Sequence, residues 1–513
     1  MDDSRVRGFP KVLVSVVVFA LVAAGCTGGT DEAAPEPTSE PTIGVVDRAE
    51  PMQLDVLTYN VEYGGDETTD EVIRRIDADI VGVLESYNRL PRIARVTGYP
   101  YYNVGLQILS KYPIHEPSAA DGLYSLIEVE PDHVVAFFNT HLDYVKYGPM
   151  LYLRGMPLDE VIASEREVRT ASMEILIPDM ERLASEGVPV ILTGDFNTPS
   201  HEDYTEATVG TREGIDVPIV WPTTEALVDA GLYDTYRAIH QDPVAVPGLT
   251  KDNPDFREGG FGDRIDYLFA GGPVTTLDSR LVGEPGGTDV DLEFDPWTSD
   301  HRAVLSTLET TPVPLPTTLS LTRRLITEGE RLDAYTNAPG HGEVEVSVSP
   351  EDTPTDVVPT AQAPGRGEIT LATEELAPGG YEVVMSANDQ EIARNAFWVR
   401  SLEDDIVLTT DQETYEPGEP ITVMWDDGPA NRWDWIGFYE ASASDPKKDD
   451  YLLWGYTGGH ESGALPPQVF GELTFNEDSQ GRPWPLPPGR YVIHYLLTDQ
   501  YASAGSTEIS IRA

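Results

Sequence analysis

Acidic, amide and imidazole side chains stand at or just after the ends of strand-like runs in this sequence. A set rich in oxygen ligands suits a hard divalent cation such as Mg²⁺, which proteins usually hold through one or two carboxylates. Histidines nearby can move protons during the attack of water. Each residue alone is better explained by a turn, a helix cap or a solvated strand end, but five coincidences in one region favour a shared cation site. The five sets are Asn60 with Glu62, Glu85, His141 with Asp143, Asp195 with Asn197, and Asp300 with His301.

The elements that must position these residues alternate between strands and helices over residues 51–310. Thr68 and Glu71 have the spacing of a capping box in front of a helical pattern of apolar residues. A longer helical pattern covers residues 158–185. Since sites in α/β folds form at strand ends, the sequence predicts an α/β domain with its site at one edge. The predicted strands cover residues 54–59, 80–84, 134–140, 188–193 and 265–270.

Seven short segments between residues 54 and 308 resemble the motifs of the endonuclease/exonuclease/phosphatase superfamily, also called deoxyribonuclease-like. Each motif is weak alone, and together they are highly specific. The resemblance implies an α/β four-layer sandwich, with two β-sheets flanked by helices, for residues 51–310. The segments are residues 58–62 (TYNVE), 83–85 (VLE), 108–114 (ILSKYPI), 139–143 (NTHLD), 194–198 (GDFNT), 263–267 (DRIDY) and 299–302 (SDHR).

The resemblance also implies a division of labour among the candidate residues. Asn60, Glu85 and Asp300 would hold Mg²⁺ or Mn²⁺, and Asn197 would contact the scissile phosphate. The other roles are that Asp195 orients or deprotonates the attacking water, His301 paired with Asp266 serves the phosphoryl centre, and His141 stabilises charge there.

Three further residues have roles that the resemblance leaves open. Asp234 matches a family motif of less settled role and fits a buried helix-capping aspartate equally well. Glu62 matches an acidic position that supports the metal ligands rather than binding the ion itself. Asp143 follows His141 closely enough to share its site.

Length and charge bound the domain count and the substrate. At 513 residues the chain exceeds the roughly 250 to 300 residues of one hydrophobic core, so two or more domains are expected. The net charge of −54 opposes binding to long polyanions, which normally draws on clustered Lys and Arg. Small phosphoesters fit this charge more easily.

The N-terminus resembles a bacterial lipoprotein signal. A basic start precedes the apolar run 12–24, and small residues lead into Cys26, the one cysteine of the chain. The resemblance implies a signal peptide over residues 1–25, lipidation of Cys26, and export to the outer side of the bacterial cell membrane. Residues 26–50 are rich in Thr, Pro, Glu and Ala and read as a flexible tether.

A proline-rich stretch, residues 310–317, separates the α/β domain from a tail without helical periodicity. Leu376–Tyr381 recurs in similar form as Leu486–Tyr491, which predicts two tandem all-β immunoglobulin-like sandwich modules, residues 318–400 and 405–513. The second is similar to the SKICH fold, and its aromatic residues 433–439 and 452–454 are expected in the core.

The reading favoured by these residues is a metal-dependent phosphoester hydrolase that cleaves a diester, less readily a monoester, by direct attack of water. A nuclease is the runner-up, and a surface-binding protein that acts through its β modules, toward a surface or a protein partner, is the alternative from another class. A nuclease needs a basic stretch interleaved with aromatics, and the best candidate is better explained as a solvated helix with core tyrosines. That stretch is residues 88–102, with Arg89, Arg92, Arg95, Tyr99, Tyr101 and Tyr102.

Overall fold

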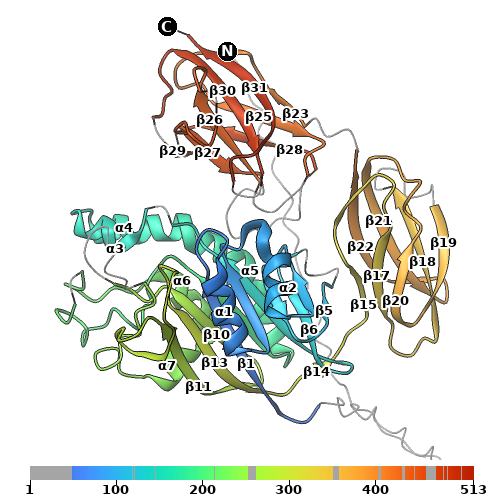
Figure 1. Ribbon diagram of the computed structural model, residues 1–513, viewed down its shortest axis with the longest axis horizontal. Coiled ribbons are helices and arrows are strands. Elements are labelled where there is room, and N and C mark those ends of the chain that lie inside the picture. Colours follow the sequence, from blue (N-terminus) through green and yellow to red (C-terminus); the bar gives the residue numbers. More distant parts are fainter. Residues whose placement is uncertain are drawn as a thin grey trace, which may run out of the picture. The chain divides into compact units, whose positions relative to one another are not determined.

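The computed structural model describes most of the chain after residue 48 (Figure 1). The predicted signal peptide, the lipidated Cys26 and nearly all of the tether lie outside the described residues. Within the described part, no helix is long and apolar enough to cross a membrane. The described residues are 49–512 without 118–119, 121, 145, 213, 252–261, 351–357, 402–405, 430–433, 444, 458–468, 478, 482 and 498–499.

Residues 51–310 build two sheets. The first has the strand order β12-β11-β13-β1-β2-β4-β3, in which β1 runs parallel to β2 and antiparallel to β13. Its strands are β1 (Met52–Asn60), β2 (Ile80–Leu84), β3 (Tyr101–Asn103), β4 (Ile108–Ser110), β11 (Val274–Gly283), β12 (Val290–Glu293) and β13 (Ala303–Thr310).

The second sheet has the order β5-β6-β7-β8-β10-β9, and β14 (Val313–Pro314) also pairs with β7. The proline-rich stretch after residue 310 thus adds a short strand to this sheet. The other strands are β5 (Ile114–His115), β6 (Ser125–Glu130), β7 (His133–His141), β8 (Val190–Asp195), β9 (Tyr233–Asp234) and β10 (Asp266–Gly271).

Helices cover the outer face of each sheet, so the layers are helices, sheet, sheet, helices (Figure 1). Helices α1 (Glu67–Ile76) and α2 (Leu90–Thr97) pack on the first sheet, and α5 (Ala171–Ser185) packs on the second with α6 (Pro222–Asp229). Leu54, Ile80 and Phe137 belong to a third buried cluster that fills the space between the sheets. The remaining helices are α3 (Gly148–Leu153), α4 (Leu158–Glu165) and α7 (Thr235–Ile239), together with a 3-10 turn at Tyr87–Arg89 and a π-helical turn, Arg166–Thr170, that joins α4 to α5.

Two local predictions were wrong. Helix α1 is capped by Asp66, whose carboxylate accepts from the N–H groups of Thr68 and Thr69, because an aspartate two residues before Thr68 competes for the N-cap. Tyr99 is in the core as predicted, but Tyr101 and Tyr102 are 41% and 46% exposed because their short strand β3 is the last in its sheet.

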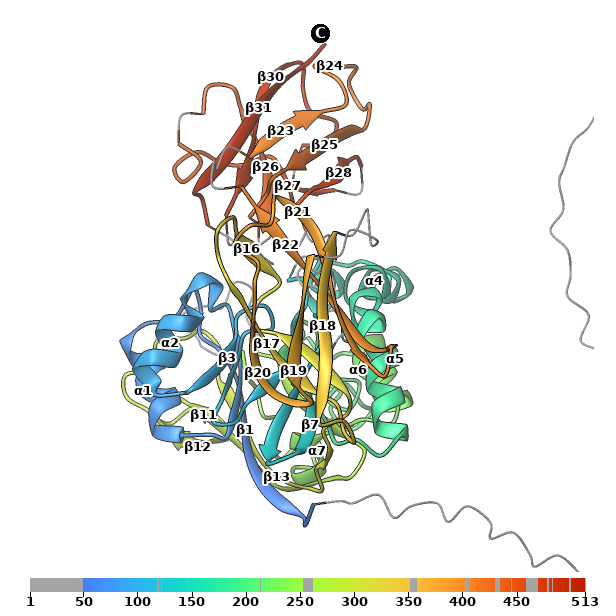
Figure 2. The same cartoon turned by 90° about the vertical axis from the view of Figure 1, so that its right-hand side faces the viewer.

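The described residues after β14 form only strands, in two groups with matching topology (Figure 2). The first group pairs β15 (Thr318–Leu321), β17 (Leu332–Asn337) and β20 (Arg366–Leu371), and separately β16 (Leu325–Thr327), β22 (Gln390–Arg400), β21 (Gly379–Ala387), β18 (Glu343–Pro350) and β19 (Val358–Pro364). The second pairs β23 (Val407–Thr410), β25 (Ile421–Asp426) and β28 (Gly471–Phe475), and separately β24 (Thr414–Tyr415), β31 (Ser503–Ile511), β30 (Gly489–Leu496), β26 (Trp435–Glu440), β27 (Leu453–Tyr456) and β29 (Gln480–Gly481).

The first group buries one apolar cluster drawn from both of its sheets, and the second buries a similar cluster and a smaller one that contains Trp435 and Tyr439. The predicted core role of the aromatics in the second group is confirmed for three of them, whereas Trp454 is only half-buried. Trp435, Phe438 and Tyr439 are at most 5% exposed. Trp433 lies outside the described residues.

Candidate active site

Three candidate residues form one row across the second sheet. His141 at the end of β7 lies opposite Asp195 of β8, and Asp195 lies opposite Asp266 of β10. Side chains alternate between the two faces of a strand, and Phe137, Ile191 and Leu268 point into the space between the sheets. Each candidate lies an even number of residues from the apolar residue on its own strand: His141 from Phe137, Asp195 from Ile191 and Asp266 from Leu268. Their side chains therefore belong to the same inner face.

The first sheet supplies Asn60 and Glu85 at the ends of the parallel strands β1 and β2. The Asn60 Nδ2 group donates to Glu85 Oε1 at 3.0 Å and to Asp195 Oδ2 at 3.1 Å. Asn60 is fully buried. One amide therefore ties the carboxylates of the two sheets together.

The turn before β13 brings in Asp300 and His301. Ser299 Oγ donates to the Asn60 carbonyl at 2.7 Å and accepts from the His301 N–H at 3.1 Å, so the turn is fastened to the end of β1. His301 Nδ1 then lies 2.9 Å from Asp266 Oδ2, and the Asp300 N–H donates to Glu62 Oε2 at 3.0 Å. The predicted pairing of His301 with Asp266 is present.

Asn197 connects Asp195 with His141. Its N–H donates to Asp195 Oδ1 at 2.9 Å, and its Nδ2 lies 3.1 Å from His141 Nε2. Asn197 and Glu85 both have left-handed backbone conformations, with φ of 49° and 57°. Such conformations cost energy in residues other than glycine and concentrate at functional sites, which is consistent with the placement of both residues here.

Burial and mutual charge set the ionisation of the central residues. Burial alone would raise the pKa of Asp195, but the nearby His301, His141 and Lys251 lower it overall, so Asp195 is a carboxylate. Burial would lower the pKa of His301, but Asp266 and Asp195 raise it to about 9. Near neutral pH the centre therefore pairs an anionic Asp195 with a protonated His301.

A divalent cation suits the carboxylates at the mouth of the first sheet. Burial raises the pKa of Glu62, and the charges of Asp300 and Glu85 raise it further, so these acids are close enough to repel one another. Hard oxygen donors in mutual repulsion are the ligands that Mg²⁺ takes. Asn60 presents Nδ2 to these carboxylates while its Oδ1 accepts from the Glu62 N–H, so it would have to turn its amide to become a ligand.

Among the described residues, Asp195, Asp266 and His301 bring their ligand atoms within 4.8 Å of one another and could hold an ion as well. In this group the Nδ1 atom of His301 is engaged by Asp266. Asp143, two residues after His141, is half-buried.

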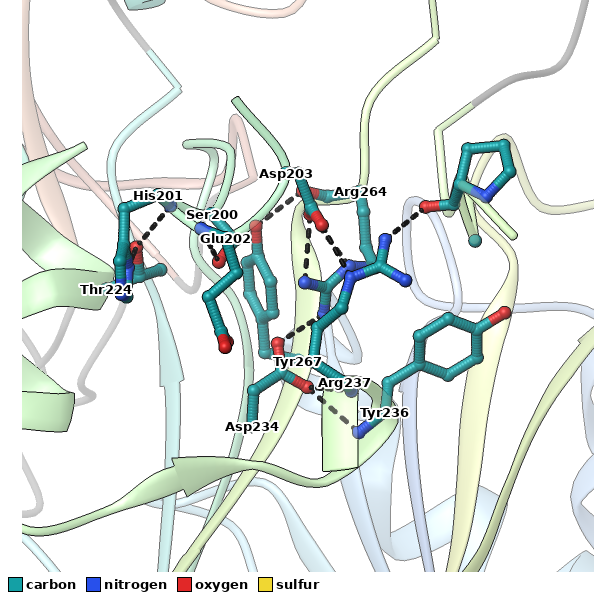
Figure 3. Close-up of polar contacts among 12 residues, drawn as sticks. Ser200, His201, Glu202, Asp203, Thr224, Asp234, Tyr236, Arg237, Arg264 and Tyr267 are labelled. Atoms are coloured by element: carbon teal, nitrogen blue, oxygen red, sulfur yellow. Dashed lines mark hydrogen bonds and ion pairs between the residues drawn. The ribbon is translucent and has the colours of Figure 1, made fainter. Parts of the chain in front are cut away.

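Asp234 is a scaffold residue. Its Oδ1 accepts from the N–H groups of Tyr236 and Arg237 and so caps α7, while its Oδ2 pairs with the buried Arg264 (Figure 3). Asp203 pairs with both arginines, at 2.6 Å from Arg237 Nε and 2.9 Å from Arg264 Nε (Figure 3). Because Arg264 lies two residues before Asp266, this network fixes the start of β10.

No sequence pattern points to Lys251, which the structure brings into the site. Lys251 Nζ lies 2.6 Å from Asp300 Oδ2 and 2.9 Å from His301 Nε2. Burial lowers the pKa of Lys251, but the carboxylates of Asp300, Asp195 and Asp266 raise it overall, so it stays an ammonium ion. No strand end marks Lys251, because an isolated bridge to Asp263 places it.

The arginine-rich stretch is partly neutralised. Arg92 pairs with Asp70 at 2.7 Å, and Arg89 donates to the Gly65 carbonyl. The predicted helix is present as α2, Leu90–Thr97.

Residues 57–301 match the Endonuclease/Exonuclease/phosphatase family. An uncharacterised protein of Caenorhabditis elegans is 31% identical over 239 residues, which are 42% of this chain and 75% of that protein. The chain belongs to the endonuclease/exonuclease/phosphatase family.

Solved structures that resemble this chain include an endonuclease/exonuclease/phosphatase from Beutenbergia cavernae. The match has 16% identity and a TM-score of 0.34, and it covers 67% of this chain and 99% of that one. Truncated TDP2 of Caenorhabditis elegans matches 50% of this chain and 98% of its own, with 20% identity and TM-score 0.32. An AP endonuclease from Archaeoglobus fulgidus matches 49% and 98%, with 16% identity and TM-score 0.34.

Proposed function

We propose that this chain is a divalent-metal-dependent phosphoester hydrolase that cleaves a phosphodiester, less readily a monoester, by direct attack of water. The observation that supports it best is the row His141–Asp195–Asp266 in one sheet, closed by Asn60, Glu85 and His301 from other segments. Membership of the family gives the reaction class. The family does not name the substrate, which has to be inferred from the chemistry of the site.

Glu85 and Asp300, with Asn60 after an amide turn, would hold Mg²⁺ or Mn²⁺. Such a cation, when bound, stabilises the negative charge that develops on phosphoryl oxygens. We favour these residues over the group of Asp195, Asp266 and His301, because there the near nitrogen of His301 already bonds to Asp266. Mg²⁺ also prefers carboxylates to imidazole.

The protein's own residues orient the reaction. Asp195 accepts the Asn197 N–H on Oδ1 and the Asn60 amide on Oδ2, and the second lone pair of Oδ2, which lies 3.6 Å from His301 Nδ1, would accept a hydrogen bond from the attacking water. Asp266 holds the His301 ring through Nδ1, which leaves Nε2 to donate to a phosphoryl oxygen. Asn197 Nδ2 and His141 Nε2, 3.1 Å apart, offer two further polar contacts to the phosphate. Together these donors stabilise charge that grows in the transition state.

Cleavage of nucleic acid is the second candidate function, and one observation favours it. Tyr101 and Tyr102 are exposed beside an arginine-bearing helix, and exposed aromatics can stack on single-stranded bases. Against it stand the net charge of −54 and the pairing of Arg92 with Asp70.

We propose further that the chain is exported and lipid-anchored through Cys26, with residues 26–50 as tether. The tandem strand groups are proposed to be immunoglobulin-like modules, the second SKICH-like, that bind a surface or a protein partner. Labelling of growing cells with a clickable palmitate analogue tests the anchor. The wild type should carry the label and Cys26→Ser should not. Equal labelling of the two would refute the lipid anchor.

A substrate panel tests the reaction. The purified protein would be incubated with bis-nitrophenyl phosphate, nitrophenyl phosphate, single-stranded DNA, RNA and sphingomyelin in the presence of Mg²⁺ or Mn²⁺. Faster turnover of the diester than of the monoester is expected. Inertness toward every ester with every metal would refute the proposed hydrolase, and selective cleavage of DNA or RNA would establish the nuclease instead.

A further inference from the structure

Lys251 occupies the substrate side of His301. The imidazole uses Nδ1 to bond Asp266, so Nε2 is the nitrogen left for a phosphoryl oxygen, and Lys251 Nζ lies 2.9 Å from that atom. The contact to Asp300 uses one of the three N–H donors of the ammonium group, and the protonated His301 ring does not accept another at Nε2, so two donors remain for an anion between these two cations. The side chain is still 40% exposed, so an incoming anion can reach it.

The backbone of Lys251 is fastened to the segments that carry the catalytic pair. Lys251 and Asp263 exchange backbone hydrogen bonds of 3.0 and 3.2 Å in an isolated bridge. The preceding Thr250 accepts the Asp266 N–H on its hydroxyl at 3.0 Å and the Arg302 N–H on its carbonyl at 2.7 Å. Lys251 is thereby held in register with both Asp266 and His301, which is the preorganisation that a substrate contact needs.

An anionic ester needs a cation at this point. The chain carries a net charge of −54, and Glu62, Glu85 and Asp300 are crowded at the same mouth. We propose that Lys251 is a substrate-contacting residue whose ammonium group binds a phosphoryl oxygen of the anionic substrate beside His301. This inference rests on the proposed function and adds to it a cation that none of the family motifs in the sequence contains.

The competing explanation is that Lys251 serves only as the counterion of Asp300. The two explanations differ in what a substitution does to anion binding. If Lys251 contacts a phosphoryl oxygen, its substitution should weaken the binding of inorganic phosphate. The loss of affinity should also be larger for the dianionic nitrophenyl phosphate than for the monoanionic bis-nitrophenyl phosphate. A counterion predicts an altered requirement for Mg²⁺ with phosphate binding unchanged.

The test compares Lys251→Gln and Lys251→Arg of the full chain with the wild type. The matched control is Lys111→Gln, because Lys111 makes ion pairs with Asp77 and Asp79 in the same domain. Titration calorimetry with inorganic phosphate, with and without Mg²⁺, measures anion binding without turnover. Thermal unfolding of each variant checks the fold, and Lys251→Met replaces the glutamine variant if that variant does not fold.

Lys251→Gln is expected to weaken phosphate binding about 10- to 100-fold, the range for a lost charge-assisted hydrogen bond. Lys251→Arg should keep most of the affinity, and Lys111→Gln should match the wild type. Unchanged phosphate affinity in folded Lys251→Gln overturns the inference, whether or not its Mg²⁺ requirement changes. Failure of the wild type to hydrolyse any ester would instead refute the proposed function, and the calorimetric comparison would still decide the contact.

Discussion

At the scale of single residues, Asp195 is the side chain on which most contacts of the site converge. It accepts from Asn60 and from the Asn197 N–H, and its Oδ2 lies 3.6 Å from a ring nitrogen of both His141 and His301. The sequence identified it because a strand-like run ends there and a family motif covers it. Lys251 escaped identification because its place depends on a bridge between segments that no local pattern encodes.

Asp195→Asn should lower kcat by about 10²- to 10⁴-fold, the usual contribution of a positioned acid or base. The asparagine amide has nearly the shape of the carboxylate, but only one of its two terminal atoms is an oxygen that can accept a hydrogen bond. The rate of bis-nitrophenyl phosphate hydrolysis measures the effect, with Asp179→Asn, a change in the half-exposed pair with Arg182, as the control. A loss below threefold in the folded Asp195 variant would remove Asp195 from the mechanism.

At the scale of elements, the alternation of strands and helices was enough to predict the strands that carry the candidate residues, while the close approach of the two sheets could not be predicted. A β-carbon added at Gly82 of β2 would lie 2.0 Å from Thr193 Oγ1 and 2.6 Å from Asn139 Oδ1 of the facing sheet. Glycine at this strand position is thus required by packing between sheets. A glycine in a buried strand signals close approach but does not name the partner.

Gly82→Ala should destabilise the protein by about 1–3 kcal/mol, the usual cost of overpacking a tight core, and should lower kcat because the sheets carry opposite halves of the site. Denaturant midpoints measure the first effect. The control is Gly105→Ala, whose new β-carbon would be no nearer than 3.4 Å to its neighbour. Equal midpoints for the two variants would contradict this packing argument.

Asp263, in the loop before β10, should make the stability of the protein depend on pH. Asp263 is buried and accepts from Tyr147 and Tyr204, and burial raises its pKa to about 6. The folded chain therefore holds this proton more tightly than the unfolded chain, whose aspartates titrate near 3.9. The contribution of Asp263 to stability is fully present below about pH 4 and is lost as the pH rises through about 6, by about 3 kcal/mol.

Comparison of wild type with Asp263→Asn isolates this group. The difference in their unfolding free energies should move in favour of the variant by about 3 kcal/mol between pH 4 and pH 7. Denaturation at a series of pH values provides the measurement. A difference that stays constant over this range would show that Asp263 is already ionised when the chain folds at pH 4.

At the scale of the whole molecule, composition and motif spacing were enough to predict an α/β domain followed by strand-rich modules, and the described residues have these elements. The match of strand order between the two C-terminal groups agrees with the repeat seen in the sequence. Charge is the global property with a functional consequence. A net charge of −54 repels a polyanion over a distance that salt shortens.

Cleavage of an oligonucleotide, if it occurs, should therefore speed up with added salt. A basic nuclease behaves in the opposite way, because salt weakens its phosphate contacts. Values of kcat/KM for single-stranded DNA and for bis-nitrophenyl phosphate, measured over a range of KCl concentrations, should rise for the DNA and change little for the small diester. A steep fall for the DNA would reveal a basic binding surface and favour the nuclease.

The proposed hydrolysis depends on carboxylate and imidazole groups from distant segments acting around one divalent cation. The most direct measurement is the initial rate of bis-nitrophenyl phosphate hydrolysis by the wild type and by Glu85→Gln, before and after removal of metal with EDTA and after titration with Mg²⁺. The expected result is loss of the wild-type rate with EDTA, full recovery with Mg²⁺, and a much higher Mg²⁺ requirement in Glu85→Gln. A wild-type rate that persists in EDTA, or a Glu85→Gln variant with the wild-type Mg²⁺ dependence, would contradict it.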